Sequence, residues 1–209
     1  MKLIVSDFDL TFFDSDYDEN IKLINNFVEK GNVFIIATGR SVIGLKKAIQ
    51  NKNINFQYLI CSDGSVILDD KFNILQSVVF EPKIINEIIE KIENDENLKL
   101  MDIDKNNDGI SAVYAVFHSL EYAKDVLDNI LKHYDVKGYV STHGIKIINK
   151  NISKVSGIEY IKNIINIPDD DIYTIGDRIN DFEMIDKYNG YLIGKNANSF
   201  QEFIEKIDN

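Results

Sequence analysis

An alternation of short apolar runs with segments of helical period constrains this chain most. Apolar runs of strand type occupy residues 2–6, 32–38 and 57–61, and helical patterns lie between them near 18–31 and 41–51. Strands that are apolar without interruption are typical of parallel sheets, which are buried on both faces. Strand, helix and strand at this spacing predict βαβ units, and therefore an α/β fold built on a parallel sheet.

The pattern changes between residues 82 and 149. This stretch is predicted to form helix, strand, strand twice over, with antiparallel hairpins in place of parallel strands. The strand and helix alternation returns after residue 150. We therefore predict a discontinuous Rossmann-like core over 1–81 and 150–209, with a small α+β domain, 82–149, inserted into it.

Composition argues against several classes of protein. The 209 residues carry a formal net charge of −11, whereas a surface that binds nucleic acid is usually basic. We therefore expect neither nucleic acid nor an anionic membrane as a partner. No segment approaches the ~20 apolar residues of a membrane span, the start does not resemble a signal peptide, and the single cysteine, Cys61, allows no intramolecular disulfide. We expect a cytoplasmic protein that is a monomer or a weak homodimer.

Polar clusters follow the predicted parallel strands, at the sheet edge where open α/β folds bind their ligands. The first strand leads into DFDLT (7–11), the second into TGRS (38–41), and a later one into GDRIND (176–181). Lys154 lies near the start of the helix that follows the insert. Carboxylates as close as those of the first cluster repel each other, which indicates either a solvated turn or a site that needs a cation.

In this order, the four clusters resemble the motifs of haloacid dehalogenase-like phosphohydrolases. The insert falls between the threonine motif and the lysine motif, and residues 176–184 match the pattern GDxxNDxxM. Both features resemble those of the Cof-type branch of this family, whose smallest C2-type cap consists of two αββ units. The resemblance implies a Mg²⁺-dependent phosphatase whose substrate is a small phosphorylated metabolite, such as a sugar phosphate.

The resemblance also implies roles for the acidic residues. Asp7 would attack phosphorus and form an aspartyl-phosphate. Asp9 would protonate the leaving oxygen and then take a proton from the hydrolytic water. Mg²⁺, a hard cation that takes oxygen ligands, would be bound by the side chains of Asp7 and Asp177 and by the backbone carbonyl of Asp9, with Asn180 and Asp181 beside it.

By the same resemblance, Thr38 and the backbone N–H of Gly39 would bind phosphate, and Lys154 would neutralise both the nucleophile and the phosphate. Arg40 either contacts the substrate or pairs with an acid, and the sequence leaves both roles open. Asp63 stands where Cof-type members often carry asparagine, near the substrate entrance; it is either a turn residue or a determinant of specificity. His143, at a turn of the insert, is a candidate for facing the substrate.

Two other functions stay open. A phosphomutase shares the aspartate pair and the C2-type cap, but it needs a basic cap, and lysine and arginine are sparse at the predicted turns. A non-catalytic module that binds metal or phosphate would be expected to lack Asp7 or Asp9, and both are present. The segment DKNNDG (104–109) resembles the start of a calcium loop, but Ala115 stands where the last acidic ligand belongs, so we predict a hairpin turn.

Overall fold

The computed structural model describes residues 1–208, which form two compact units. The first unit contains residues 1–75 and 153–208, and the second contains Gln76–Ile152. The sequence-based limits were 81/82 and 149/150, so the inserted unit is longer than the pattern indicated. Its first residues bond to the insert itself: the amide of Phe80 donates to the carbonyl of Ile110 at 2.9 Å.

A seven-stranded sheet organises the first unit, in the order β11-β10-β1-β2-β3-β4-β5. Five neighbouring strands, β11 to β3 in that order, run parallel, and β4 pairs with β3 in the antiparallel sense. The strands are β1 (Leu3–Ser6), β2 (Val33–Ala37), β3 (Tyr58–Cys61), β4 (Val66–Asp69), β5 (Ile74–Ser77), β10 (Ile172–Gly176) and β11 (Asn189–Leu192).

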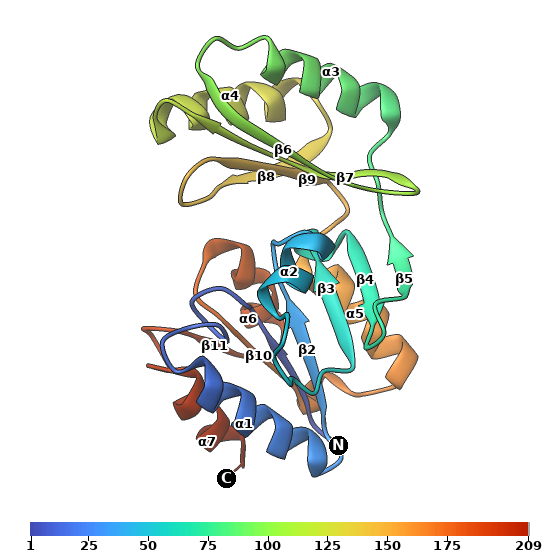
Figure 1. The fold of residues 1–209 in the computed structure, drawn as a ribbon, viewed down its shortest axis with the longest axis vertical. Coiled ribbons are helices and arrows are strands. Elements are labelled where there is room, and N and C mark those ends of the chain that lie inside the picture. The colour runs from blue at the N-terminus through green and yellow to red at the C-terminus, as the bar shows by residue number, and fades with distance from the viewer. Residues whose placement is uncertain (209) are drawn as a thin grey trace. The chain divides into compact units, whose positions relative to one another are not determined.

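Helices cover both faces of this sheet, because alternate residues of the central strands point to opposite sides. In β2, Phe34 and Ile36 belong to one buried cluster, and Ile35 and Ala37 belong to the other. The first cluster includes side chains of α1 (Tyr17–Glu29), α2 (Val42–Ala48) and α7 (Phe200–Asp208). The second includes side chains of α5 (Lys154–Ile165) and α6 (Phe182–Lys187), so the unit has three layers, as Figure 1 shows.

The second unit is an antiparallel sheet with two helices on one face (Figure 1). The strand order is β6-β7-β9-β8, and α3 and α4 contribute isoleucine and leucine side chains to one core with the inward residues of β7 and β9. Each helix precedes two strands: α3 (Pro82–Glu93), β6 (Leu98–Asn106) and β7 (Gly109–Phe117), then α4 (Leu120–His133), β8 (Val136–Val140) and β9 (Ile145–Asn149).

The predicted fold class is confirmed, with a mostly parallel sheet in one unit and a separate antiparallel sheet in the other. The segment proposed as a hairpin turn, 104–109, contains the end of β6, a two-residue turn at 107–108 and the first residue of β7, with Asn106 paired with Gly109. None of the helices among residues 1–208 combines the length and the apolar character that crossing a membrane would require.

Candidate active site

Three adjacent strand ends bring predicted site residues together in the first unit. β1 lies between β2 and β10, and its last residue, Ser6, is in register with Ile36 on one side and Ile175 on the other. The next residue, Asp7, stays attached to the sheet, because its amide donates to the Ile175 carbonyl at 2.9 Å. Asp177 follows β10 directly, so the two aspartates leave the sheet side by side.

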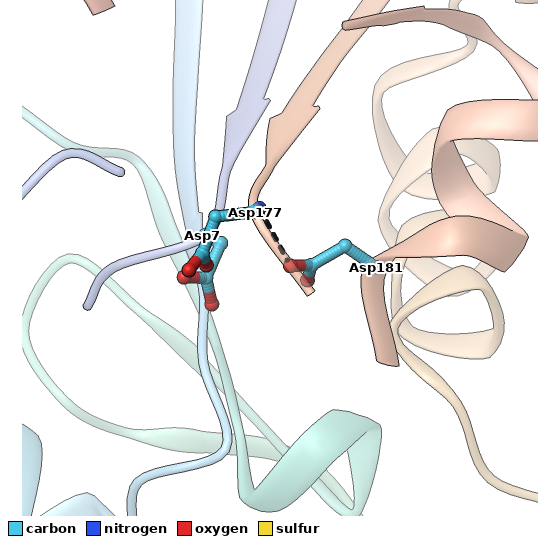
Figure 2. Close-up of side chains that lie close together, drawn as sticks. All are labelled: Asp7, Asp177 and Asp181. Atoms are coloured by element: carbon cyan, nitrogen blue, oxygen red, sulfur yellow. Dashed lines mark hydrogen bonds between the residues drawn. The ribbon is translucent and has the colours of Figure 1, made fainter. Parts of the chain in front are cut away.

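Asp7, Asp177 and Asp181 form one acidic cluster, which Figure 2 shows. Each residue offers a carboxylate oxygen, and these oxygens all lie within 4.8 Å of one another. Asp7 and Asp181 are buried, and Asp177 is partly buried. Within residues 1–208, these three are the group of acidic, histidine or cysteine side chains arranged closely enough to share one cation.

Asp181 is fixed in place by hydrogen bonds to both of its oxygens. Oδ2 accepts the backbone N–H groups of Asp177, at 3.1 Å, and Arg178, at 3.0 Å, and Oδ1 accepts the ammonium of Lys154 at 2.5 Å. Gly176 makes room for this arrangement, since a Cβ atom there would lie 2.4 Å from Cγ of Asp181. Asp181 therefore orients the cluster, and Asp7 and Asp177 are better suited to bind a cation directly.

Lys154 is the cation that the structure already places among these carboxylates. It is the first residue of α5, it is 1% exposed, and its Nζ donates to Oδ1 of Asp7 and to Oδ1 of Asp181, each at 2.5 Å. Two other lysines lie close to it in the sequence, but Lys146 lies near Asp104 and Lys150 pairs with Asp135, both in the second unit.

The charges of the cluster are unbalanced. Burial raises the pKa of Asp7 to about 7, and the charges of Asp181 and Asp177 add to the rise, although Lys154 opposes it. Burial likewise raises the pKa of Asp177. Burial acts to lower the pKa of Lys154, but the charges of Asp181 and Asp7 outweigh it and raise that pKa. A divalent cation would relieve this excess of negative charge, and Mg²⁺ prefers such oxygen ligands.

The loop after β2 lies at the same edge of the sheet. Thr38 is 1% exposed, its amide donates to the carbonyl of Ile60 at 2.8 Å, and its hydroxyl accepts the amide of Arg40 at 3.1 Å. Gly39 lies between these two residues, in the loop that leads to α2. The loop predicted to bind phosphate is thus fixed by two hydrogen bonds of Thr38, one to β3 and one to Arg40 within the loop.

Arg40 pairs with an acid, which is one of the two roles that the sequence left open. Its Nε donates to Oδ2 of Asp9 at 2.8 Å, and its Nη2 donates to Oδ1 of the same carboxylate at 2.6 Å. Both oxygens of Asp9 therefore face the guanidinium group. Asp9 is not a member of the acidic cluster defined above, although it lies two residues beyond Asp7.

Asp63 lies deeper than the sequence suggested. It lies two residues beyond the end of β3, is 2% exposed and has a φ of 57°, and its Oδ1 accepts a hydrogen bond from Nδ2 of Asn180 at 3.1 Å. Its charge also contributes to the raised pKa of Lys154. The signal that could have found it is the one that found the others, a polar residue at the end of a parallel strand. His143 belongs to the turn between β8 and β9 in the second unit.

Comparisons with known proteins agree with this arrangement. The model of the haloacid dehalogenase-like hydrolases matches residues 4–107 and 93–202. A Buchnera aphidicola subsp. Baizongia pistaciae protein named "Putative phosphatase" is 25% identical over 223 aligned positions, covering 88% of this chain and 82% of the relative.

Solved structures share the fold. A "putative HAD/COF-like hydrolase" from Plasmodium vivax has a TM-score of 0.84 at 19% identity, covering 100% of this chain and 95% of its own. The sucrose-phosphatase of Synechocystis, solved with sucrose and phosphate, has a TM-score of 0.74 at 16% identity, covering 99% of this chain and 87% of its own.

Proposed function

Because the chain belongs to the haloacid dehalogenase-like hydrolases, with the Cof-type arrangement, we propose that it is a Mg²⁺-dependent phosphatase of small phosphate monoesters. One observation carries the proposal. Carboxylates from both ends of the chain, Asp7 and Asp177, meet at one edge of the parallel sheet, beside the buried ammonium of Lys154. The name of the Buchnera relative supports a phosphatase, and the fold shared with sucrose-phosphatase supports sugar phosphates as substrates.

The proposed reaction has two steps, and both use residues at this edge. In the first, a carboxylate oxygen of Asp7 attacks phosphorus, the bond to the leaving oxygen breaks, and Asp9 gives that oxygen a proton. In the second, water attacks the aspartyl-phosphate, Asp9 takes the proton of the water, and inorganic phosphate leaves Asp7 free. Lys154 offsets the charge of Asp7 throughout, while Thr38 and Gly39 bind the phosphoryl oxygens.

The residues present fit a magnesium ion. Side-chain oxygens of Asp7 and Asp177 and the backbone carbonyl of Asp9 would hold it, and Asp181 and Asn180 would support these ligands from beside them. When bound, Mg²⁺ would neutralise charge on the phosphoryl oxygens. A small phosphorylated metabolite is the partner that this site suits, and the net charge of −11 gives no support to a nucleic-acid partner.

A panel of phosphate esters, assayed with and without Mg²⁺, tests the proposal beside Asp7→Asn. We expect phosphate release that depends on Mg²⁺ and falls by at least ~10³-fold in the variant, because the nucleophile is lost. Asp18→Asn is the matched control, since its side chain is 80% exposed, and it should keep full activity. Intramolecular transfer without net release would indicate a phosphomutase, and Mg²⁺ binding without turnover of any ester would indicate a binding module.

A further inference from the structure

We propose that Arg40 is the positioning residue of Asp9, and that it serves the second step of the reaction, the hydrolysis of the aspartyl-phosphate. The inference rests on the proposed function, and it assigns Arg40 a role through Asp9 in place of direct contact with the substrate. Its basis is the two-pronged ion pair between the guanidinium of Arg40 and both oxygens of Asp9, at 2.8 and 2.6 Å.

Three contacts fix Arg40, so its guanidinium group lies in a defined position. Its amide donates to the hydroxyl of Thr38 at 3.1 Å, and its carbonyl accepts the amide of Ser62 at 2.9 Å. Its guanidinium carbon lies 5.4 Å from the centre of the Phe8 ring, within the range of a cation–π contact. The hydrogen bonds to Asp9 also raise the pKa of Arg40, so the guanidinium stays charged.

The backbone that carries Asp9 is also well defined. The amide of Phe13 donates to the carbonyl of Phe8 at 2.7 Å, and the amide of Leu10 donates to the carbonyl of Phe13 at 3.0 Å. The rings of Phe8 and Phe13 stack with centroids 5.3 Å apart. The Asp9 side chain, however, is 42% exposed, and an exposed carboxylate without a partner would sample several rotamers. Arg40 removes that freedom, because a planar fork binds a carboxylate in one orientation.

Both oxygens of Asp9 accept hydrogen bonds from Arg40, and the second step needs Asp9 to accept a proton from water. One O–H bond of the attacking water breaks and its proton goes to Asp9, while the water oxygen bonds to phosphorus. The bond between phosphorus and Asp7 then breaks, which regenerates the Asp7 carboxylate and releases inorganic phosphate. Orientation of the base before the reaction lowers the entropic part of this barrier.

Pre-steady-state kinetics with p-nitrophenyl phosphate separate the two steps, because its leaving group departs without a proton donor. In Arg40→Met with Mg²⁺, we expect the rapid release of the first equivalent of p-nitrophenolate to keep its rate within about twofold, since Asp7 is phosphorylated as before. The steady-state rate should fall by at least ~10-fold, because acid–base groups contribute 10²–10⁴-fold in general. Arg40→Lys, which keeps the charge without the fork, should lie between the two.

A double-mutant cycle with Asp9→Asn shows whether Arg40 acts through Asp9. In the Asp9→Asn background, Arg40→Met should cause no further loss. Lys52→Met is the matched control: it removes a lysine that pairs with Asp18 at 2.6 Å and lies 5.2 Å from the centre of the Tyr17 ring. That variant should leave both kinetic phases unchanged, and thermal unfolding of each variant checks that it is folded.

Two results would overturn the inference. One is a slower first equivalent in Arg40→Met, and the other is an equal loss from Arg40→Met with and without Asp9→Asn; either means that Arg40 contacts the substrate itself. The wild-type arm keeps the proposed function separate: if wild-type protein releases no phosphate from any ester with Mg²⁺, the phosphatase assignment fails, whatever Arg40 does.

Discussion

Lys154 is the residue on which the charge balance of the site depends. It places one ammonium group against two carboxylates in a region where the lysine is 1% exposed. Buried ion pairs contribute little net stability, but removal of one partner is costly, because the other charges stay buried without compensation. The two carboxylates that it pairs, Asp7 and Asp181, would then repel each other.

Lys154→Met should therefore lower the free energy of unfolding of the metal-free protein by about 3–5 kcal/mol. Lys162→Met is the matched control on the same helix, because Lys162 pairs with Asp169 at 2.5 Å with its side chain 23% exposed and that of Asp169 50% exposed. Such a pair is worth about 1 kcal/mol or less. Urea unfolding with EDTA measures both, and equal losses in the two variants would contradict the role given to Lys154.

The sequence identified several residues of the site, but it did not identify the partners of their side chains. The strand-end rule brought Asp7, Asp177 and Lys154 to one edge, because their positions relative to the apolar runs determine where each backbone leaves the sheet. The sequence left open what Arg40 binds. The family resemblance placed Asp63 near the substrate entrance, and the structure shows that this residue is buried. Hydrogen bonds such as those from Arg40 to Asp9, which are 31 residues apart, leave no periodic trace in the sequence.

Helix α5 is the element that delivers Lys154, and its position depends on close packing against β3. Gly157, three residues after Lys154, faces Ile60, and a Cβ atom at Gly157 would lie 2.7 Å from Cγ2 of Ile60. The helix can thus approach the strand only because this residue has no side chain. Any increase in volume there should displace α5, and with it the ammonium group.

Gly157→Ala should destabilise the protein by about 1–3 kcal/mol through overpacking, although alanine favours helices more than glycine does. Combination with Ile60→Ala separates the two effects. Ile60→Ala alone should lower the free energy of unfolding by about 2–5 kcal/mol, because it leaves a cavity. In the Ile60→Ala background, Gly157→Ala should become neutral or stabilising. Chemical denaturation of the four proteins completes the cycle; the same cost for Gly157→Ala in both backgrounds would show that Ile60 is not the obstacle.

The elements themselves were largely predictable, since β2 and β3 are continuous apolar runs and the long helices have an apolar stripe. The limits of the inserted unit were not predictable from the sequence. Ser77 is the last residue of β5 and Val79 follows that strand, yet Asn106 donates to the hydroxyl of Ser77 at 2.9 Å and Asn149 donates to the carbonyl of Val79 at 3.1 Å. These bonds join distant segments, and the local composition of 76–81 does not reveal them.

For the whole molecule, the discontinuous core links the site to global folding. Asp7 comes from the first segment of the core, and Lys154, Asp177 and Asp181 come from the segment after the insert. The cluster therefore exists only when both segments are folded together, and the protonation of Asp7 must affect the free energy of unfolding. The pKa of Asp7 rises from 3.8 to about 7 on burial in the cluster, so the folded state holds a proton that the unfolded chain has already lost.

The protonation of Asp7 makes the stability of the protein depend on pH. Below about pH 4, Asp7 is protonated in both states, and its contribution to stability is fully present; it is lost as the pH rises to about 7. The unfolding free energy of wild-type protein minus that of Asp7→Asn, measured with EDTA, should therefore fall over this range, by up to about 4 kcal/mol at 1.36 kcal/mol for each pKa unit. The unfolding free energy of wild-type protein minus that of Asp18→Asn should instead rise with pH, because hydrogen bonding to Lys52 lowers the pKa of Asp18. At pH 8, Mg²⁺ at 100 times its Kd should restore about 2.7 kcal/mol in wild-type protein. If the difference between wild-type protein and Asp7→Asn stays flat or rises with pH, Asp7 is not buried among the carboxylates of the cluster.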